Sequence, residues 1–330
     1  MKDRITVAIV QTTPAFDDLA ACLALLEART RDAAAQGADL VTLGETFLPG
    51  YPAWLDTSPG AAFWDHEPVK DVYANLRRNS VVVGGPETEW MGRLVRELGI
   101  TLVVGVHERV EQGPGSHTLY NALLTFTPEG ILANHHRKLV PTYTERLVWG
   151  PGDGDGLRAV DADGVRVSSL VCWEHWMPLA RQALHESGEQ VHVAVWPTVH
   201  DRHQLASRHY AFEGRCFVLA AGQLGRVRDM PAALQPAGAD PDELLLRGGS
   251  CIFGPDGSVV AAPRFDEDVT LVAELDLTRV DAEAMTLDVT GHYHRPDVFE
   301  FGVRSLNARA SATTDGPAAP DPPPVSRRDP

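Results

Sequence analysis

Cysteine is scarce in this chain of 330 residues, which contains only four: Cys22, Cys172, Cys216 and Cys251. They are scattered, with no CxxC pair and no spacing typical of metal ligands. This distribution argues against a disulfide framework and against a cysteine-ligated metal centre. A reducing, cytoplasmic compartment is the location that we predict from it.

Positive charge is also in short supply. The chain carries 29 Lys and Arg against 45 Asp and Glu, a formal net charge of −16. Such a balance disfavours nucleic acid or an anionic membrane surface as the main partner, and solubility is its simplest explanation.

Long apolar runs are missing as well. No stretch approaches the length of a membrane span, and the apolar run at residues 5–10 is too short for a signal peptide and lacks a cleavage-site pattern. We therefore expect a soluble protein without a membrane partner.

Strands and helices are predicted to alternate along the chain. The sequence predicts a buried strand at residues 5–10 and a second strand at residues 39–43. Between them it predicts a helix with Asp17 or Asp18 as its N-terminal cap. Hairpin patterns at residues 120–135 and 250–262 add antiparallel strands in two similar units. The fold class is therefore α/β with mixed sheets. We predict one domain over residues 1–306 and a disordered tail rich in Pro, Ala and Asp over residues 307–330.

Two segments do not fit this alternation. Residues 49–68 form a loop rich in Pro, Gly, Trp and Tyr, which we interpret as a lid or a pocket wall, with core packing as the alternative. Residues 225–247 are rich in Pro, Ala and Asp, and we expect them to leave the core as an excursion.

Cys172 is predicted to lie at the corner between a strand and a helix. The apolar residues 165–171 precede it, and Pro178 suits the first turn of a following helix. At the carboxyl end of a strand a thiol faces the ligand side of an open α/β sheet, and nearby backbone amides can stabilise a thiolate or an oxyanion. The alternative is a small buried hydrophobic residue.

Glu45 and Lys138 also follow predicted strands. Taken singly, a glutamate after a strand is usually solvated, and the basic run at residues 135–138 is usually an exposed face. Together with Cys172 they make a carboxylate base, a cation and a nucleophile, which are the groups needed for addition to a polarised carbon.

These residues lie in short motifs that resemble those of the nitrilase superfamily of carbon–nitrogen hydrolases, and its nitrilase branch most of all. The motifs are Gly44-Glu45-Thr46-Phe47, His136-Arg137-Lys138-Leu139-Val140-Pro141-Thr142 with Glu145-Arg146, and Cys172-Trp173-Glu174-His175. Residues 190–197 and 291–297 extend the resemblance to roughly residues 5–300. Cys-Trp-Glu separates nitrilases from many amidase branches.

The resemblance implies a four-layer αββα sandwich of two mixed sheets, with Glu45, Lys138 and Cys172 as catalytic triad. It implies that Glu145 positions Lys138 and the substrate, that the Trp173 amide helps to hold the tetrahedral intermediate, and that Glu174 is a secondary candidate. The implied activity is hydrolysis of a nitrile to a carboxylic acid and ammonia through a thioimidate and a thioester. If the thiol left before ammonia, the product would be an amide.

The rest of the site is predicted less directly. Aromatic candidates for the walls of the substrate pocket are Tyr51, Trp54, His175, Trp176 and Trp196, with core packing as the alternative. His175 stands where other nitrilases carry asparagine, which could tune substrate choice. The spacing of His192, His200, His203 and His209 fits no metal motif, so we expect no metal and no cofactor.

Other functions stay open at this stage. An amidase or carbamoylase would use the same triad, and cyanide hydrolysis is a narrower variant. A catalytically silent subunit of an assembly and a metal-dependent hydrolase are the remaining alternatives. The expected partners are a small nitrile, water and further copies of the chain, because the family forms homodimers that often extend into helical homo-oligomers.

Overall fold

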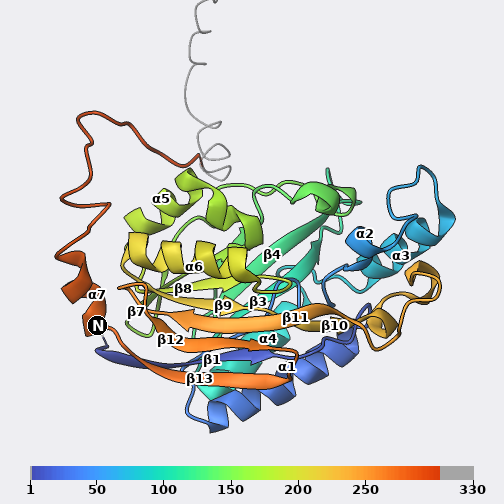
Figure 1. The fold of residues 1–330 in the computed structure, drawn as a ribbon, viewed down its shortest axis with the longest axis horizontal. Helices are drawn as coiled ribbons and strands as arrows, with labels where there is room; N and C mark the ends of the chain where they lie inside the picture. The colour runs from blue at the N-terminus through green and yellow to red at the C-terminus, as the bar shows by residue number, and fades with distance from the viewer. Residues whose placement is uncertain (1, 305–330) are drawn as a thin grey trace, which may run out of the picture.

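The computed structural model describes residues 2–304, which fold into two β-sheets packed face to face between two layers of helices (Figure 1). This confirms the α/β class and the four-layer αββα sandwich predicted above. The predicted tail at residues 307–330 lies outside the described residues.

The first sheet has the strand order β13-β1-β2-β3-β4-β5. Its strands are β1 (Arg4–Gln11), β2 (Leu40–Thr42), β3 (Thr101–Arg109), β4 (Leu119–Phe126), β5 (Leu132–Arg137) and β13 (Val269–Asp276). β1, β2 and β3 run parallel, whereas β4, β5 and β13 add antiparallel pairs. The predicted hairpin at residues 120–135 is the β4–β5 pair.

The second sheet follows the same plan, with the order β10-β11-β9-β8-β7-β6 and β12 also paired to β11. Its strands are β6 (Val160–Ala162), β7 (Val165–Val171), β8 (Val191–Val195), β9 (Phe217–Ala221), β10 (Leu224–Arg226), β11 (Leu244–Phe253) and β12 (Val259–Phe265). Here β7, β8 and β9 are parallel, and β11–β12 is the second predicted hairpin.

Alternation along the strands produces the layers. In β1, Val7 and Ile9 belong to the apolar core shared with the second sheet. Ala8 and Val10 lie in a separate core with Cys22 of the covering helix, since successive strand residues face opposite sides. The covering helices are α1 (Leu19–Ala35) and α4 (Pro86–Leu98) on the first sheet, and α5 (Pro178–Glu186) and α6 (Asp201–Gly214) on the second.

The local sequence explains where these helices begin. The Asp18 carboxylate accepts a hydrogen bond from the Ala21 amide at 2.9 Å and caps α1, as one of the two predicted caps. Pro86 and Pro178 occupy the first turns of α4 and α5, where a missing N–H costs nothing.

A third apolar cluster lies at one end of the sandwich (Figure 1). It joins α2 (Trp54–Thr57) and α3 (Glu67–Arg78) to the 225–247 excursion: Trp54 and Leu76 pack in one cluster with Val227, Met230 and Leu234. Sequence reasoning assigned no helix between residue 68 and Pro86 and so missed α3. Val72 and Leu76 of α3 are buried, and Val69 and Tyr73 pack against the same cluster. These four residues recur at helical spacing, so the sequence does carry a signal for this helix.

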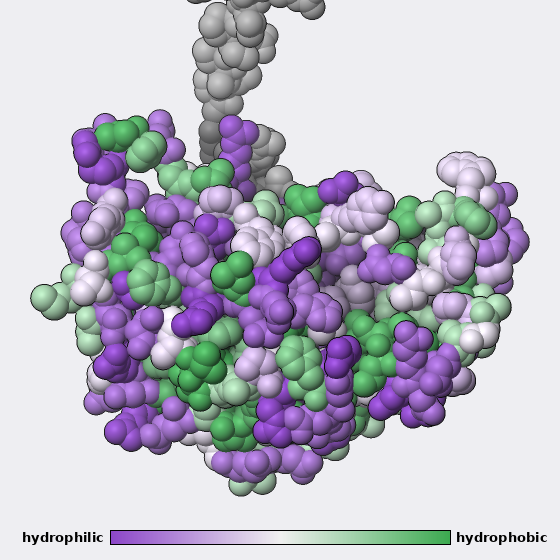
Figure 2. All heavy atoms as spheres, in the orientation of Figure 1, coloured by the Kyte–Doolittle hydropathy of each residue, from purple (hydrophilic) through white to green (hydrophobic). Residues whose placement is uncertain are grey.

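The outer surface agrees with the acidic composition. The face over α5, α6 and the edge of the second sheet is mostly hydrophilic, with small separate hydrophobic patches (Figure 2). Exposed apolar residues on the two helices include Leu179, Leu205 and Phe212. The last helix, α7 (Thr278–Ala284), follows β13. Within residues 2–304 no helix has both the length and the apolar character needed to cross a membrane.

Gly105 of β3 allows the chain after β2 to approach closely. A Cβ at this position would lie 2.5 Å from the Thr46 nitrogen and 2.8 Å from the Gly44 oxygen. Both contacts are with backbone, which cannot rotate away, so glycine is required where Glu45 enters the space between the sheets.

We therefore expect Gly105→Ala to lower the free energy of unfolding by roughly 1–3 kcal/mol, the usual cost of overpacking a core. Gly302→Ala is the control, since nothing lies within 4 Å of an added Cβ there. Denaturant unfolding of both variants measures the difference, and equal stability would contradict the steric argument.

Candidate active site

The ends of three strands meet between the two sheets. Glu45 follows β2, Lys138 directly follows β5, and Cys172 directly follows β7. The backbone of Glu45 spans the sheets, because its amide donates to the Trp196 carbonyl at 3.4 Å and its carbonyl accepts from Gln223 Nε2 at 2.6 Å. The structure thus brings together the three residues that sequence reasoning proposed as nucleophile, base and cation.

The Lys138 ammonium is the centre of this site. Its Nζ donates to Glu45 Oε1 at 3.0 Å and to Glu145 Oε2 at 2.6 Å, and all three side chains are buried. One carboxylate oxygen of Glu45, one of Glu145 and Cys172 Sγ lie within 4.8 Å of one another. The predicted positioning residue Glu145 therefore contacts Lys138 directly.

Neighbouring side chains leave one carboxylate oxygen free. Asn121 Nδ2 of β4 donates to Glu45 Oε1 at 2.7 Å, while Glu45 Oε2 has no hydrogen-bond partner among the described residues. Glu145 is held from two sides, by the Tyr51 hydroxyl at 3.0 Å and the Thr142 amide at 2.7 Å. Glu145 is thus fixed, whereas Glu45 keeps an oxygen that can accept a proton.

Burial and mutual charge set the protonation of this cluster. Burial raises the pKa of Glu45 to about 7, with Glu145 adding to the effect and Lys138 opposing it. For Lys138 burial opposes the charge, but Glu45, Cys172 and Glu145 outweigh it and raise its pKa. Burial and the Glu45 carboxylate raise the pKa of the Cys172 thiol well above its ordinary value. A neutral thiol therefore faces a cation and a carboxylate suited to general base catalysis near neutral pH.

The turn that carries Cys172 is held in a strained conformation. Cys172 begins a short 3-10 helix (Cys172–Trp176), and its φ of 53° lies in the left-handed region. A non-glycine residue there costs on the order of 1–3 kcal/mol unless its surroundings hold it.

Glu174 provides part of that hold. Its carboxylate accepts from the Val171 and Leu139 amides, each at 2.7 Å, and contacts His136 Nε2 at 2.9 Å. Burial alone would raise the pKa of Glu174, but His136 and the two amides bind the ionised carboxylate and lower it. Glu174 therefore joins the turn before Cys172 to the segment after Lys138. No sequence signal pointed to His136 or Asn121 in these roles.

Cys172 opens onto a cavity of about 350 Å³. Its walls combine apolar and polar groups from five segments of the chain: Tyr51, Ala53, Asp56, Thr57, Thr142, Tyr143, Thr144, Glu145, Trp173, Pro197, Thr198, His200, His203, Leu245 and Leu246. A cavity of this size suits a small organic molecule.

The predicted pocket residues only partly agree with these walls. Tyr51 lines the cavity, but Trp54 and Trp196 are buried in apolar cores, and Trp176 lies partly exposed outside it. His175 is buried, with its ring turned to other side chains. An aromatic residue near a nucleophile can face the core as well as the pocket, and its identity does not distinguish the two.

Glu45, Glu145 and Cys172 are also the one group of described residues whose ligand atoms could surround a metal ion. The Lys138 ammonium already lies between the two carboxylates and bonds to both. Its positive charge occupies the place of a cation, so this donor set fits a lysine-centred site better than a metal centre.

Comparison with known proteins places this site in a family context. The family described as "Carbon-nitrogen hydrolase" matches residues 6–284. An aliphatic nitrilase of Sinorhizobium fredii (strain HH103) is 39% identical over 308 residues, covering 91% of this chain and 96% of the relative. An arylacetonitrilase of Trametes versicolor is 36% identical over 329 residues, covering 94% and 100%.

A solved structure shows the same fold. The carbon–nitrogen hydrolase superfamily protein XC1258 of Xanthomonas campestris superposes with a TM-score of 0.66 at 20% identity, covering 91% of this chain and all of that one.

Removing the cation should leave two buried carboxylates facing each other. We expect Lys138→Met to lower the free energy of unfolding by about 3–5 kcal/mol at pH 8, the usual effect of breaking a buried ion pair. Lys138 lowers the pKa of Glu45, so without it that pKa rises further above the unfolded value. The folded variant then binds protons more readily than the unfolded chain, and its stability decreases as the pH rises above about 4.5.

Denaturant unfolding at pH 5 and pH 8 checks this prediction. Lys70→Met is the matched control, because Lys70 forms exposed ion pairs with Asp65 and Glu67, which contribute little. A stability deficit in Lys138→Met that did not shrink at pH 5 would contradict the electrostatic explanation.

Proposed function

The chain belongs to the carbon–nitrogen hydrolase family, and we propose that it is a nitrilase that hydrolyses an organic nitrile to the carboxylic acid and ammonia. The observation that carries this proposal is the buried Lys138 ammonium bonded to Glu45 and Glu145 beside the Cys172 thiol. The two relatives named as nitrilases favour a nitrile as the carbon–nitrogen bond that is cleaved.

The first step forms a bond between Cys172 Sγ and the nitrile carbon. Glu45 takes the thiol proton as the sulfur attacks and passes it to the nitrile nitrogen, which gives a thioimidate and restores the Glu45 carboxylate. Negative charge that develops on nitrogen is stabilised by the Lys138 ammonium and by the Trp173 amide, which hydrogen-bonds to Cys172.

Two molecules of water complete the reaction. Glu45 activates the first water, which adds to the thioimidate carbon to give a tetrahedral intermediate. Loss of ammonia leaves a thioester, and a second water releases the acid and restores the thiol. If the carbon–sulfur bond broke before the carbon–nitrogen bond, the product would be the amide.

The cavity supports an aliphatic or arylaliphatic nitrile as substrate. Tyr51, Trp173, Leu245 and Leu246 supply apolar wall, and the volume of about 350 Å³ exceeds what hydrogen cyanide needs. A catalytically silent subunit is disfavoured, because a chain without chemistry to perform would keep three buried ionisable groups at a cost in stability.

The test is release of ammonia and acid from phenylacetonitrile, benzonitrile, an aliphatic dinitrile, cyanide and the matching amides. We expect acid from phenylacetonitrile or the dinitrile, and a loss of at least about 10⁴-fold in Cys172→Ala because the nucleophile is missing.

The control is Cys251→Ala, in which a fully buried cysteine outside the site is replaced. Turnover of amides alone would assign the protein to an amidase or carbamoylase reaction, and turnover of cyanide alone to a cyanide hydrolase. Absence of any turnover by a folded protein would contradict a hydrolase and favour the silent subunit.

The dependence of kcat/KM on pH should show the ionisation of Glu45 on its acidic side. Its carboxylate must be ionised to accept the thiol proton, so kcat/KM decreases below about pH 7, where the raised pKa of Glu45 lies. Glu145 adds to that raised pKa, and Glu145→Gln should therefore move the decrease to lower pH. The exposed Glu111→Gln serves as control and should leave the profile unchanged. A profile unmoved by Glu145→Gln would show that another group titrates.

A further inference from the structure

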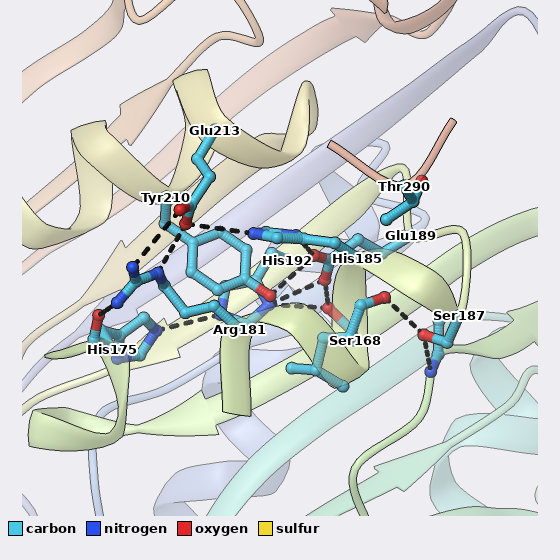
Figure 3. Close-up of polar contacts among 12 residues, drawn as sticks. Ser168, His175, Arg181, His185, Ser187, Glu189, His192, Tyr210, Glu213 and Thr290 are labelled. Atoms are coloured by element: carbon cyan, nitrogen blue, oxygen red, sulfur yellow. Dashed lines mark hydrogen bonds and ion pairs between the residues drawn. The ribbon is translucent and has the colours of Figure 1, made fainter. Parts of the chain in front are cut away.

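A second buried polar cluster lies behind the nucleophile, and the proposed reaction does not use it. It is drawn in Figure 3 and comprises Ser168 of β7, His192 of β8, Glu189 before that strand, His185 of α5, Tyr210 and Glu213 of α6, and His175. We refer to its inner part, Ser168, His192 and His175, as the histidine chain.

The histidine chain ends on the nucleophile's own backbone. His175 Nδ1 lies 2.7 Å from the Cys172 carbonyl oxygen, and His175 Nε2 lies 3.0 Å from His192 Nε2. His192 Nδ1 in turn lies 2.6 Å from Ser168 Oγ and 3.1 Å from Glu189 Oε2. All of these side chains are buried.

The outer part of the cluster supplies its charge. Glu189 Oε1 accepts from the Tyr210 hydroxyl at 2.7 Å and contacts His185 Nδ1 at 2.8 Å. Against the effect of burial, Glu189 and Glu213 raise the pKa of His185 to about 9. His185 is therefore an imidazolium held between two carboxylates, and Glu189 stays ionised with a pKa of about 2.

Hydrogen-bonding chemistry fixes the direction of the histidine chain. A carbonyl oxygen only accepts, so His175 Nδ1 carries a proton and donates to Cys172. Burial lowers the pKa of His175 and of His192, which keeps both rings neutral. His175 Nε2 is then an acceptor, and His192 Nε2–H donates to it. The Ser168 hydroxyl beside His192 Nδ1 donates to Glu189 Oε2. Two hydrogen bonds, from His192 to His175 and from His175 to Cys172, thus point the same way and polarise each other.

The histidine chain ends on the carbonyl oxygen of Cys172, so it has no proton to deliver to the reaction. It can act only on the orientation and polarity of the peptide between Cys172 and Trp173. The Cys172 carbonyl and the Trp173 N–H belong to one planar trans peptide and point in opposite directions. A donor fixed on the carbonyl side therefore fixes the N–H side, which hydrogen-bonds to Cys172.

We propose that His175, held by His192, is a positioning residue that orients the peptide between Cys172 and Trp173 and so aims the Trp173 amide at the negative charge of nitrile addition. This role rests on the proposed function. It also fits the left-handed conformation of Cys172, where φ is 53° and regular helix geometry does not hold the peptide.

The experiment compares variants that keep or remove the donor. His175→Asn places an amide nitrogen near the position of Nδ1, whereas His175→Leu fills the space without a donor. We expect kcat on the nitrile to decrease about 10²-fold in His175→Leu with KM little changed, and to remain within several-fold of wild type in His175→Asn. His192→Gln and His192→Leu repeat the comparison one hydrogen bond farther from Cys172.

A second measurement does not depend on nitrile turnover. The rate of Cys172 alkylation by iodoacetamide is followed against pH, with Cys172→Ala as background. The Trp173 amide lowers the pKa of the thiol, so the midpoint should move to higher pH in His175→Leu and stay in place in His175→Asn. The charged groups that face the thiol, Glu45, Lys138 and Glu145, are the same in every variant.

His175 has further neighbours that none of these variants replaces. Arg181 of α5 donates to the His175 backbone carbonyl at 3.0 Å. The ring of Trp196, which follows β8, and the ring of Tyr210 of α6 pack against the His175 ring. Thermal unfolding verifies that each variant folds. If His175→Leu does not fold, the comparison of His192→Gln with His192→Leu tests the proposal instead.

The outcomes separate the two proposals. If kcat and the alkylation midpoint of the leucine variants equal those of wild type, or if His175→Asn loses as much as His175→Leu, the positioning role is overturned. If wild type turns over no nitrile, the proposed function fails, while the alkylation midpoints still decide whether His175 orients the peptide.

Discussion

The structure depends most on one buried cation. The Lys138 ammonium is taken out of water and compensated by two carboxylates, at 3.0 Å from Glu45 and 2.6 Å from Glu145. One positive and two negative charges leave one negative charge in excess. Burial raises the pKa of Glu45 to about 7, and the charge of Glu145 adds to this effect while Lys138 opposes it. In the proposed reaction Glu45 accepts the thiol proton, which leaves Lys138 and Glu145 as a balanced pair and places the new negative charge on sulfur. Lys138, the cation on which the fold depends, also lowers the pKa of Glu45 and so favours the ionised carboxylate that the proposed base needs.

Bringing these charges together requires two sheets that present their strand ends to the same space. β2 and β5 belong to the first sheet and β7 to the second, and Gly105 lets the chain after β2 come close enough for Glu45 to reach Lys138. Asn121 of β4 then orients Glu45 from the side. The fold sets the positions of Glu45, Lys138 and Cys172, and the contacts among their side chains set their protonation states.

Local patterns predicted an α/β fold with mixed sheets and the strand-end positions of three central residues, whereas the four-layer sandwich and the catalytic triad were implied by the resemblance of the motifs to a known family. The alternation of strands and helices, the two hairpins, the Asp18 cap and the strand-end positions of Glu45, Lys138 and Cys172 are all encoded by neighbouring residues. Contacts between distant residues left no such signal. Asn121 is 76 positions from Glu45 and Tyr51 is 94 positions from Glu145, so their pairing depends on the completed fold.

Residues next to the nucleophile were the hardest to interpret from sequence, for a physical reason. In a tight turn, adjacent side chains point in different directions: Trp173 lines the cavity, Glu174 binds the Leu139 amide beside Lys138, and His175 contacts His192. Trp196, expected in the pocket, instead stacks between His175 and His203.

The turn at Cys172 is held by these divergent contacts. An ionised Glu174 binds the amide before Cys172, and a neutral His175 binds the carbonyl after it, so the strained residue lies between an acceptor and a donor that are both buried. The first contact holds the peptide between Leu170 and Val171, and the second holds the peptide between Cys172 and Trp173. Both together define where the Trp173 amide points, and they come from the two residues that follow it in sequence. A motif of four residues can therefore encode the nucleophile, its stabilising amide and both supports of that amide, provided that the strand ends have first brought Lys138 and the histidine chain to either side.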